Sequence, residues 1–194
     1  MDKKVFEIAR GVVFSAVALL FVTLNPLSAT AQTTNQNKTV AVDKDWKEFH
    51  SVAGRCKMKF PNQPEHVTEK LTMPEEGYDL KYDAYIASGD KKSVYMLLVA
   101  QYPDFVDETY AQMSLEHFLN GILSHNPGNQ LIFADLLLVN GHEALDFFIR
   151  TGSVYFKGRA MMVKNSLYLM AMECEMQTYD ESRFNMFINS FQLN

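Results

Sequence analysis

The sequence predicts an α+β domain, with a twisted antiparallel β-sheet and helices packed on the faces of that sheet. Strand-like segments follow one another through short turns, and short turns join antiparallel strands because a parallel pair needs a long crossover. Two segments have the apolar spacing of amphipathic helices. The segments 93–100 and 132–139 are apolar on both faces, so both faces of the sheet need cover.

Five strands are predicted in the first half of the domain. Residues 46–50 and 55–60 flank a turn at Ala53-Gly54, and the second of these segments alternates apolar and basic side chains, as in a half-buried strand. A third strand is expected at residues 66–71. The segments 78–87 and 93–102 predict a hairpin around Ser88-Gly89-Asp90.

A helix follows this hairpin. Apolar residues recur at i, i+3, i+4, i+7 and i+8 between Leu115 and Leu123, which places them in one stripe. Ser114 is the expected N-cap, because its hydroxyl can accept a hydrogen bond from a free backbone N–H. Pro127-Gly128 is expected to end the segment.

Four more strands and a second helix complete the predicted order of elements. The strands 130–139 and 143–151 flank Asn140-Gly141, a dipeptide typical of tight hairpins, and the strands 155–163 and 167–175 flank Lys164-Asn165. The closing helix carries an apolar stripe from Phe184 to Phe191. A capping box of Thr178 and Glu181 is expected to begin it.

The N-terminus has the pattern of an export signal. Lys3, Lys4 and Arg10 precede the uncharged apolar run 11–24, and small residues at 29–31 fit a signal-peptidase site. We therefore expect a signal peptide at 1–31, a polar disordered linker at 32–45 and a single domain at 46–194. The expected location is periplasmic or extracellular, with an uncleaved N-terminal membrane anchor as the alternative. After removal of the signal, no membrane-spanning segment is expected.

The charge balance argues against nucleic acid as a partner. Without residues 1–31 the chain has 15 Lys and Arg against 21 Asp and Glu, a formal charge of −6. Binding of nucleic acid needs a concentrated basic surface, and these charges are spread evenly along the chain.

Two cysteines are present, Cys56 and Cys174, and each lies in a predicted strand. Export to an oxidising compartment would permit a disulfide between them. Such a bond requires Cα atoms within ~7 Å, which the sequence leaves open. Cys174 also belongs to a run in which Met170, Met172 and Met176 share its strand face. These soft ligands suit Cu(I), although methionine also fills the cores of two-sided buried strands, which is the interpretation we prefer here.

No local motif for catalysis or for a resident metal or cofactor is found. The five histidines lack a metal-ligand spacing, and no Gly-x-Ser-x-Gly elbow or glycine-rich phosphate loop is present. The acidic residues Asp104, Asp107 and Glu108 lack the spacing of a calcium loop and are expected in a solvated loop. We therefore expect no enzymatic activity, no cofactor and no metal site.

Residues 46–194 resemble the PsbP-like or DcrB-like family of small exported α+β domains. The resemblance rests on Trp46, on "GRCKMKFP" with its strand ending in Phe-Pro, on "LLVNGHEALDFF" and on the closing "FNMFINSFQL". It implies an exported accessory or interaction module, usually without catalytic activity.

The leading functional expectation is an exported, non-enzymatic accessory or interaction domain of the cell envelope, with a protein of the envelope as its partner. The alternative is a binder of a small hydrophobic ligand or lipid in a pocket between helix and sheet. Binding of Cu(I) through methionine and cysteine is a third interpretation. The oligomeric state is left open by the sequence.

Overall fold

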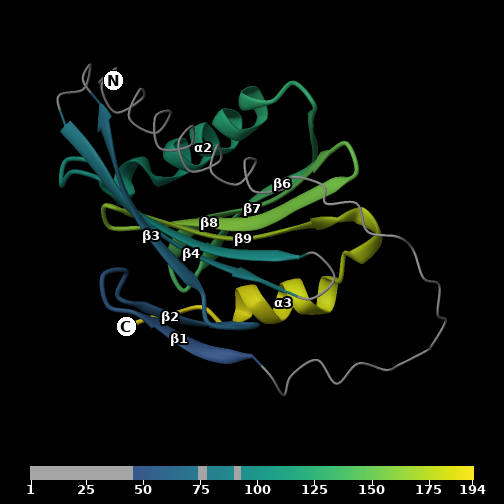
Figure 1. Ribbon diagram of the computed structural model, residues 1–194. Coiled ribbons are helices and arrows are strands. Elements are labelled where there is room, and N and C mark those ends of the chain that lie inside the picture. The colour runs from purple at the N-terminus through teal and green to yellow at the C-terminus, as the bar shows by residue number, and fades with distance from the viewer. Residues whose placement is uncertain (1–45, 74–77, 90–92) are drawn as a thin grey trace.

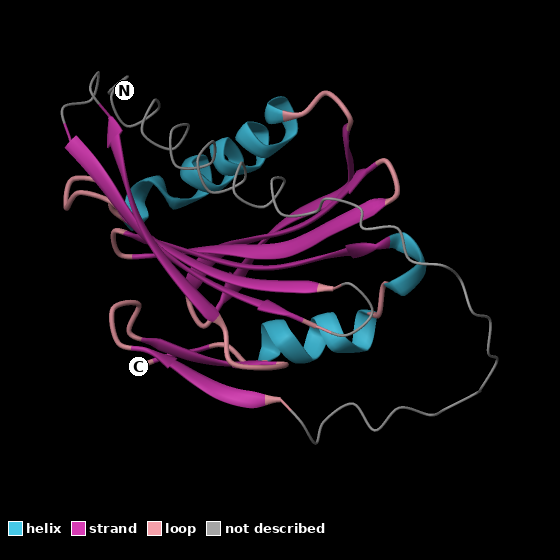
Figure 2. Cartoon of the chain, in the orientation of Figure 1, coloured by secondary structure: helices cyan, strands magenta, loops and turns pink. Residues whose placement is uncertain are grey.

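The computed structural model describes residues 46–73, 78–89 and 93–194, so the predicted signal peptide (1–31) and linker (32–45) lie outside the described residues. The described part is a layered α+β structure (Figures 1 and 2). One helix covers one face of a large sheet, and a second helix with a small sheet covers the other face. The predicted fold class is confirmed.

The large sheet has seven strands in the order β3-β4-β5-β9-β8-β7-β6, and every neighbouring pair is antiparallel. The strands are β3 (Glu65–Met73), β4 (Tyr78–Ser88), β5 (Val94–Gln101), β6 (Asn129–Val139), β7 (His142–Thr151), β8 (Val154–Val163) and β9 (Ser166–Glu175). The central strand is β9, and the two edges are β3 and β6. The predicted hairpins join the strands as expected, because each turn is too short for a crossover.

A separate small sheet was not expected from the sequence. It contains β1 (Lys47–Ser51), β2 (Cys56–Phe60) and β10 (Gln192–Leu193) in the order β1-β2-β10. The last of these strands has two residues, which is too short for an alternating pattern to reveal. Its pairing partner, β2, lies more than 130 residues earlier in the chain.

The helical elements are η1 (Glu108–Tyr110), α2 (Ala111–His125), η2 (Met176–Thr178) and α3 (Glu181–Asn189). Neither helix begins at the N-cap that the sequence predicted, so both predicted caps are wrong. Ser114 is buried inside α2, because the chain enters the helix through η1, where the Asp107 side chain accepts a hydrogen bond from the Thr109 N–H. At α3 the N-cap is Asp180, whose carboxylate accepts hydrogen bonds from the backbone N–H groups of Ser182 and Arg183.

Two hydrophobic clusters lie on opposite faces of the large sheet. Alternate residues of β9 divide between them: Leu169 and Ala171 pack in the cluster with α2, whereas Met170 and Met172 pack in the cluster with α3 and the small sheet. The β5 strand divides in the same way. Both strands are therefore buried on both faces, as the absence of polar alternation predicts.

The N-terminal end of α3 is held to the sheet by a buried lysine. Lys157, on β8, is 8% exposed, and its ammonium group donates to both carboxylate oxygens of Glu181 and to the Tyr179 hydroxyl. The same ammonium lies 4.5 Å from the centre of the Phe184 ring and 5.1 Å from that of Phe148. The ion pair and the cation–π contacts thus take the place of the water molecules that the Lys157 ammonium loses on burial.

Candidate functional site

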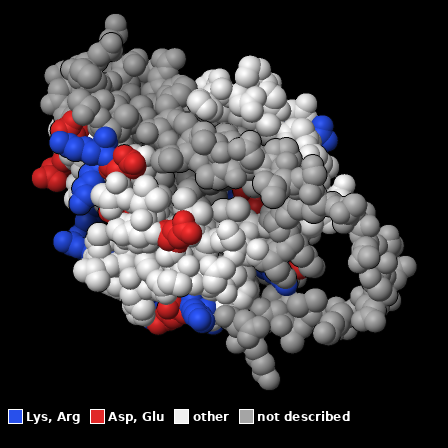
Figure 3. Space-filling view, in the orientation of Figure 1, with Lys and Arg blue, Asp and Glu red and all other residues white. Residues whose placement is uncertain are grey.

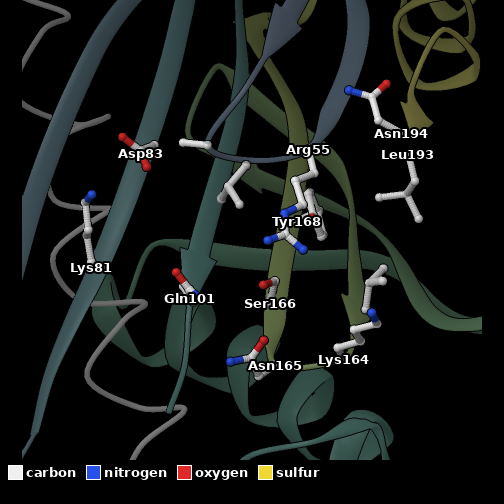
Figure 4. A pocket seen from close by; sticks show the side chains of 13 residues that line it. Arg55, Lys81, Asp83, Gln101, Lys164, Asn165, Ser166, Tyr168, Leu193 and Asn194 are labelled. Carbon is white, nitrogen blue, oxygen red and sulfur yellow. The ribbon is translucent and has the colours of Figure 1, made fainter. Parts of the chain in front are cut away.

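A cavity of about 330 Å³ lies where two turns approach the ends of β4 and β5 (Figure 4). Three basic side chains line it from three separate elements. Arg55 comes from the β1–β2 turn, Lys81 from β4 and Lys164 from the β8–β9 turn. Gln101, Asn165 and Ser166 add polar groups to the lining. We refer to it as the Arg55 cavity.

The β1–β2 turn is pinned to the large sheet. The Tyr168 hydroxyl donates to the Gly54 carbonyl over 2.8 Å, and the Gly54 N–H donates to the Ser51 hydroxyl over 2.9 Å. A Cβ at Gly54 would lie 2.9 Å from a methyl of Val99, so only glycine allows this approach. The Arg55 carbonyl accepts from the Asn194 N–H. These contacts fix the backbone from which the guanidinium extends.

The β8–β9 turn is also held by specific hydrogen bonds. The Lys164 N–H donates to a Glu108 carboxylate oxygen over 2.7 Å, and the Asn165 side chain donates to the Tyr102 carbonyl over 2.8 Å. The Lys164 N–H bond is the main cause that lowers the pKa of Glu108 below its usual value, with a further contribution from His142. The turn that presents Lys164 is therefore anchored to η1.

The backbone conformations of Arg55 and Lys164 are unusual for their residue types. Their φ angles are +46° and +54°, in the left-handed region where glycine and asparagine are the common residues. A left-handed conformation at other residues costs free energy and tends to occur at functional sites. Among the described non-glycine residues, only Asn140 shares this conformation.

The positive charge at the cavity is only partly offset by carboxylates of the described part of the chain, Asp83 near Lys81 and Glu108 near Lys164. Arg55, Lys81 and Lys164 form no ion pair with another described residue. The one acidic side chain in the lining, Asp83, accepts hydrogen bonds from Thr68 and His66. Burial alone would raise the pKa of Asp83, but these two bonds, with the charges of His66 and Lys81, hold it below its usual value. The cavity therefore has an excess of positive charge.

Sequence reasoning missed this site because its three cations are far apart in the chain and only the turns bring them together. One local signal was available. Lys164 begins a Lys-Asn hairpin turn, where asparagine or glycine is the usual residue.

The structure does not bring Cys56 and Cys174 together, although it buries both in the same cluster as free thiols. Cys56 lies beside Gly54, to which the Tyr168 hydroxyl is bonded. Cys174 is six residues further along β9 than Tyr168, which corresponds to about 20 Å. That separation is far beyond the reach of a disulfide.

We expect both thiols to be unreactive in the folded protein. Burial raises the pKa of Cys56 to about 12 and that of Cys174 to about 11, so the thiolate that reacts is scarce at neutral pH. Protein purified without reductant should react with Ellman's reagent slowly when native and should show two thiols per chain in guanidinium. No thiol in the denatured sample would contradict the free-cysteine geometry.

The methionines near Cys174 pack as core residues. Met170 and Met172 are no more than 2% exposed in the α3-side cluster, and Met176 lies outside the strand at the start of η2. On the preceding strand, Met162 belongs to the cluster on the opposite face. Adaptable filling of an irregular core accounts for this composition.

The acidic loop residues have structural partners. Asp107 caps η1, Glu108 is paired with His142 at 3.0 Å, and Asp104 accepts a hydrogen bond from Asn165. Within the described residues, no group of three or more His, Cys, Asp or Glu side chains is placed to hold a metal ion. This loop therefore serves to anchor the β8–β9 turn.

The interface between α2 and the large sheet is filled by side chains. Leu115, Phe118 and Ile122 of the helix are at most 3% exposed, and Phe147 of β7 is fully buried against them. The predicted hydrophobic pocket between helix and sheet thus finds no support at this interface. Of the described helices, none has the length and hydropathy needed to cross a membrane.

Comparisons with known proteins identify the fold. No family model matches the chain, and no curated protein matches its sequence. The solution structure of cyanobacterial PsbP from Synechocystis sp. is similar at a TM-score of 0.53 and 14% identity, covering 81% of this chain and 98% of that one.

Two other solved structures are similar at lower scores. A Bacteroides thetaiotaomicron protein has a TM-score of 0.42 and 8% identity, over 78% of this chain and 49% of that one. A Pseudomonas aeruginosa protein of unknown function has a TM-score of 0.36 and 11% identity, over 68% of this chain and 84% of that one. These two likenesses carry no argument at such scores, whereas the likeness to cyanobacterial PsbP speaks for the fold alone, and function depends on the residues of the site. The chain therefore has a PsbP-like α+β fold.

Proposed function

We propose that this chain is an exported, non-enzymatic accessory domain of the cell envelope, which binds an acidic segment of a protein partner at the Arg55 cavity. The observation that carries the proposal is the convergence of Arg55, Lys81 and Lys164 on one cavity without an ion pair among the described residues. The export half of the proposal rests on the charge and apolar pattern of residues 1–31.

The chemistry of the lining favours a carboxylate. The guanidinium of Arg55 offers parallel N–H donors that match a carboxylate in a bidentate contact, and in Figure 4 it lies between Lys81 and Lys164, which each supply a point charge. Gln101 and Ser166 can donate further hydrogen bonds. The cavity volume lies at the lower end of the range for small-molecule sites, which is enough for one or two acidic side chains.

The position of the cavity supports recognition of a protein. Its walls are formed by turns and strand ends at the surface, so an extended acidic segment can reach it without opening the core. The turns are anchored by hydrogen bonds before any ligand arrives. Little ordering is then required on binding.

The test is an NMR titration of the ¹⁵N-labelled exported protein with acetyl-Asp-Glu-amide at constant ionic strength. We expect saturable shifts at the Gln101, Asn165 and Ser166 amides, with millimolar affinity. The double variant Arg55→Gln/Lys164→Gln should weaken binding at least about tenfold, because two charge-assisted bonds are lost. The mass of the purified chain reports in the same preparation whether residues 1–31 have been removed.

The matched control is Lys47→Gln, which removes an exposed cation of β1 that does not line the cavity. It should bind like the unaltered protein. Equal shifts with acetyl-Asn-Gln-amide, or no saturable shift, would overturn the proposal. Tighter binding of inorganic phosphate than of the acidic peptide would also overturn it, and would assign the cavity to a phosphate-bearing ligand.

A further inference from the structure

The β6 strand is an exposed apolar edge of the large sheet. Among the described residues it pairs with β7 on one side only, and its residues 130–135 are exposed on both faces. Leu131, Ile132 and Phe133 are 44%, 49% and 39% exposed, and Leu138 is 67% exposed. A long apolar edge strand with unpaired backbone groups is a template for pairing with another strand.

The opposite edge, β3, carries the features that block such pairing. Its sequence is EHVTEKLTM, and Glu65, Glu69 and Lys70 are exposed charges. In Figure 3 charged side chains gather on the left of the view, over β3 and the adjoining part of β4. By contrast Asp135 is the single charged residue of β6, which has neither lysine nor proline. One edge of this sheet is protected and the other is open.

A bulge limits the part of β6 that can pair. The register with β7 shifts between Leu131 and Phe133, so Ile132 has no partner there and the strand bends. The regular segment runs from Phe133 to Val139, with Leu136 at its midpoint.

We propose that the segment Phe133–Val139 pairs antiparallel with the same segment of a second copy of this chain, about a two-fold axis at Leu136. This register places each Leu138 against Ala134 of the other copy, and each Phe133 against Val139 of the other copy. Large side chains thus face smaller ones. Leu136, at the axis, faces its own mate, and the two large sheets become one continuous sheet.

Charge is compatible with this register. Asp135 lies opposite Leu137 of the other copy, not opposite Asp135, so the two carboxylates are diagonal neighbours about 7–8 Å apart. Asp135 is exposed, and its partner on β7, Asp146, is already paired with Arg159 at 2.6 Å. Both Asp135 carboxylates therefore remain hydrated at the surface of the pair.

The buried area indicates a dimer that depends on concentration. Covering a half-exposed leucine, isoleucine or phenylalanine removes on the order of 100 Å² from water. Two of the exposed apolar residues of each copy, Phe133 and Leu138, lie in the paired segment, so the pair covers about 400 Å² of their side chains before the backbone edges are counted. Specific stable interfaces begin near 1,000 Å² in total. The interface is smaller than that threshold, so we expect a weak dimer that forms only at high protein concentration.

The difference between the two edges also determines how many copies can assemble. Pairing of β6 with β3 of the next copy would repeat without limit, and the charged β3 edge opposes it. Pairing of β6 with β6 uses the one open edge that the large sheet of the described residues has, and it closes at two. A second copy is thus the occupant that the sheet itself specifies.

Sedimentation equilibrium on the exported protein tests the proposal. We expect a concentration-dependent monomer–dimer equilibrium, which Leu138→Lys weakens at least about tenfold because two ammonium groups enter the interface. The control Val52→Lys places the same charge at a residue that is 90% exposed on the β1–β2 turn, and it should leave the equilibrium unchanged. Thermal melts verify that both variants fold.

A second measurement locates the contact. Opposed residues of antiparallel strands have Cα separations that permit a disulfide, so Leu136→Cys should cross-link to its own mate under oxidation, whereas Val52→Cys should not. A protein that is monomeric at every concentration would overturn the proposal. So would a dimer that is unaffected by Leu138→Lys and that fails to cross-link at position 136.

Discussion

Gly158→Ala is expected to lower the free energy of unfolding by about 2–3 kcal/mol. Alanine normally favours a strand relative to glycine, so the expected sign is opposite to that of intrinsic propensity. The reason is space. A Cβ at position 158 would lie 2.7 Å from the end of the Phe147 ring and 2.8 Å from the Met170 carbonyl oxygen. The carbonyl belongs to the backbone of the central strand and cannot turn away.

Urea denaturation of Gly158→Ala, with Gly158→Val as a graded second variant, measures this effect. The valine variant should lose more stability, because its two methyl groups add to the same clash. Gly128→Ala is the matched control. Its Cβ would lie 3.2 Å from the Asn126 side-chain oxygen, which can move, and at an ordinary contact distance of 3.8 Å from a Thr151 methyl, so we expect a change of less than about 0.5 kcal/mol. Equal stabilities for Gly158→Ala and the unaltered protein would show that β8 and β9 separate more easily than the geometry indicates.

Phe187→Ala is expected to cost about 3–5 kcal/mol, the range for truncating a fully buried phenylalanine. Phe187 is 0% exposed and joins α3 to both sheets. Its ring centre lies 5.5 Å from that of Phe60 on β2 and 5.1 Å from that of Tyr95 on β5, both edge-to-face. Truncation therefore leaves a cavity between three elements and removes two favourable ring contacts.

Trp46 reports this change directly, since it is the only tryptophan of the chain and its ring centre is 6.2 Å from that of Phe187. Fluorescence-monitored urea denaturation of Phe187→Ala should show the loss. Phe187→Leu, which retains most of the volume, should lose less than half as much. Val52→Ala, at an exposed position, should be neutral. A loss below about 1 kcal/mol for Phe187→Ala would mean that α3 can collapse into the space left behind.

The order of strands and helices could be predicted because each signal is local. The Asn140-Gly141 turn and the alternation of β2 depend on residues a few positions apart. The caps of α2 and α3 were missed because a cap depends on where the chain enters the helix. At α3 both Thr178 and Asp180 have suitable side chains, and the extended backbone at Asp180 decides between them.

The candidate site could not be predicted, because its charges are brought together only by the packing of turns. The backbone of Arg55 is positioned by the close packing of the preceding glycine against Val99. The backbone of Lys164 is positioned by its hydrogen bond to Glu108, 56 residues earlier. Neither contact has a sequence signature. The free cysteines are a similar case: Cys56 and Cys174 share a cluster, but Cys56 lies on β2 beside the Tyr168 region of β9, and Cys174 lies six residues further along β9.

The sequence by itself determined the α+β class, the antiparallel pairing of successive strands and the two-sided burial of β5 and β9, because these follow from side-chain periodicity and turn length. Only the tertiary structure decided that β2 joins a separate sheet with β10, that three cations surround one cavity, and that β6 is an open edge while β3 is a charged one. The physical reason is that edges, cavities and sheet partners are relations between segments distant in the chain, and these are set by how the layers pack rather than by any one segment.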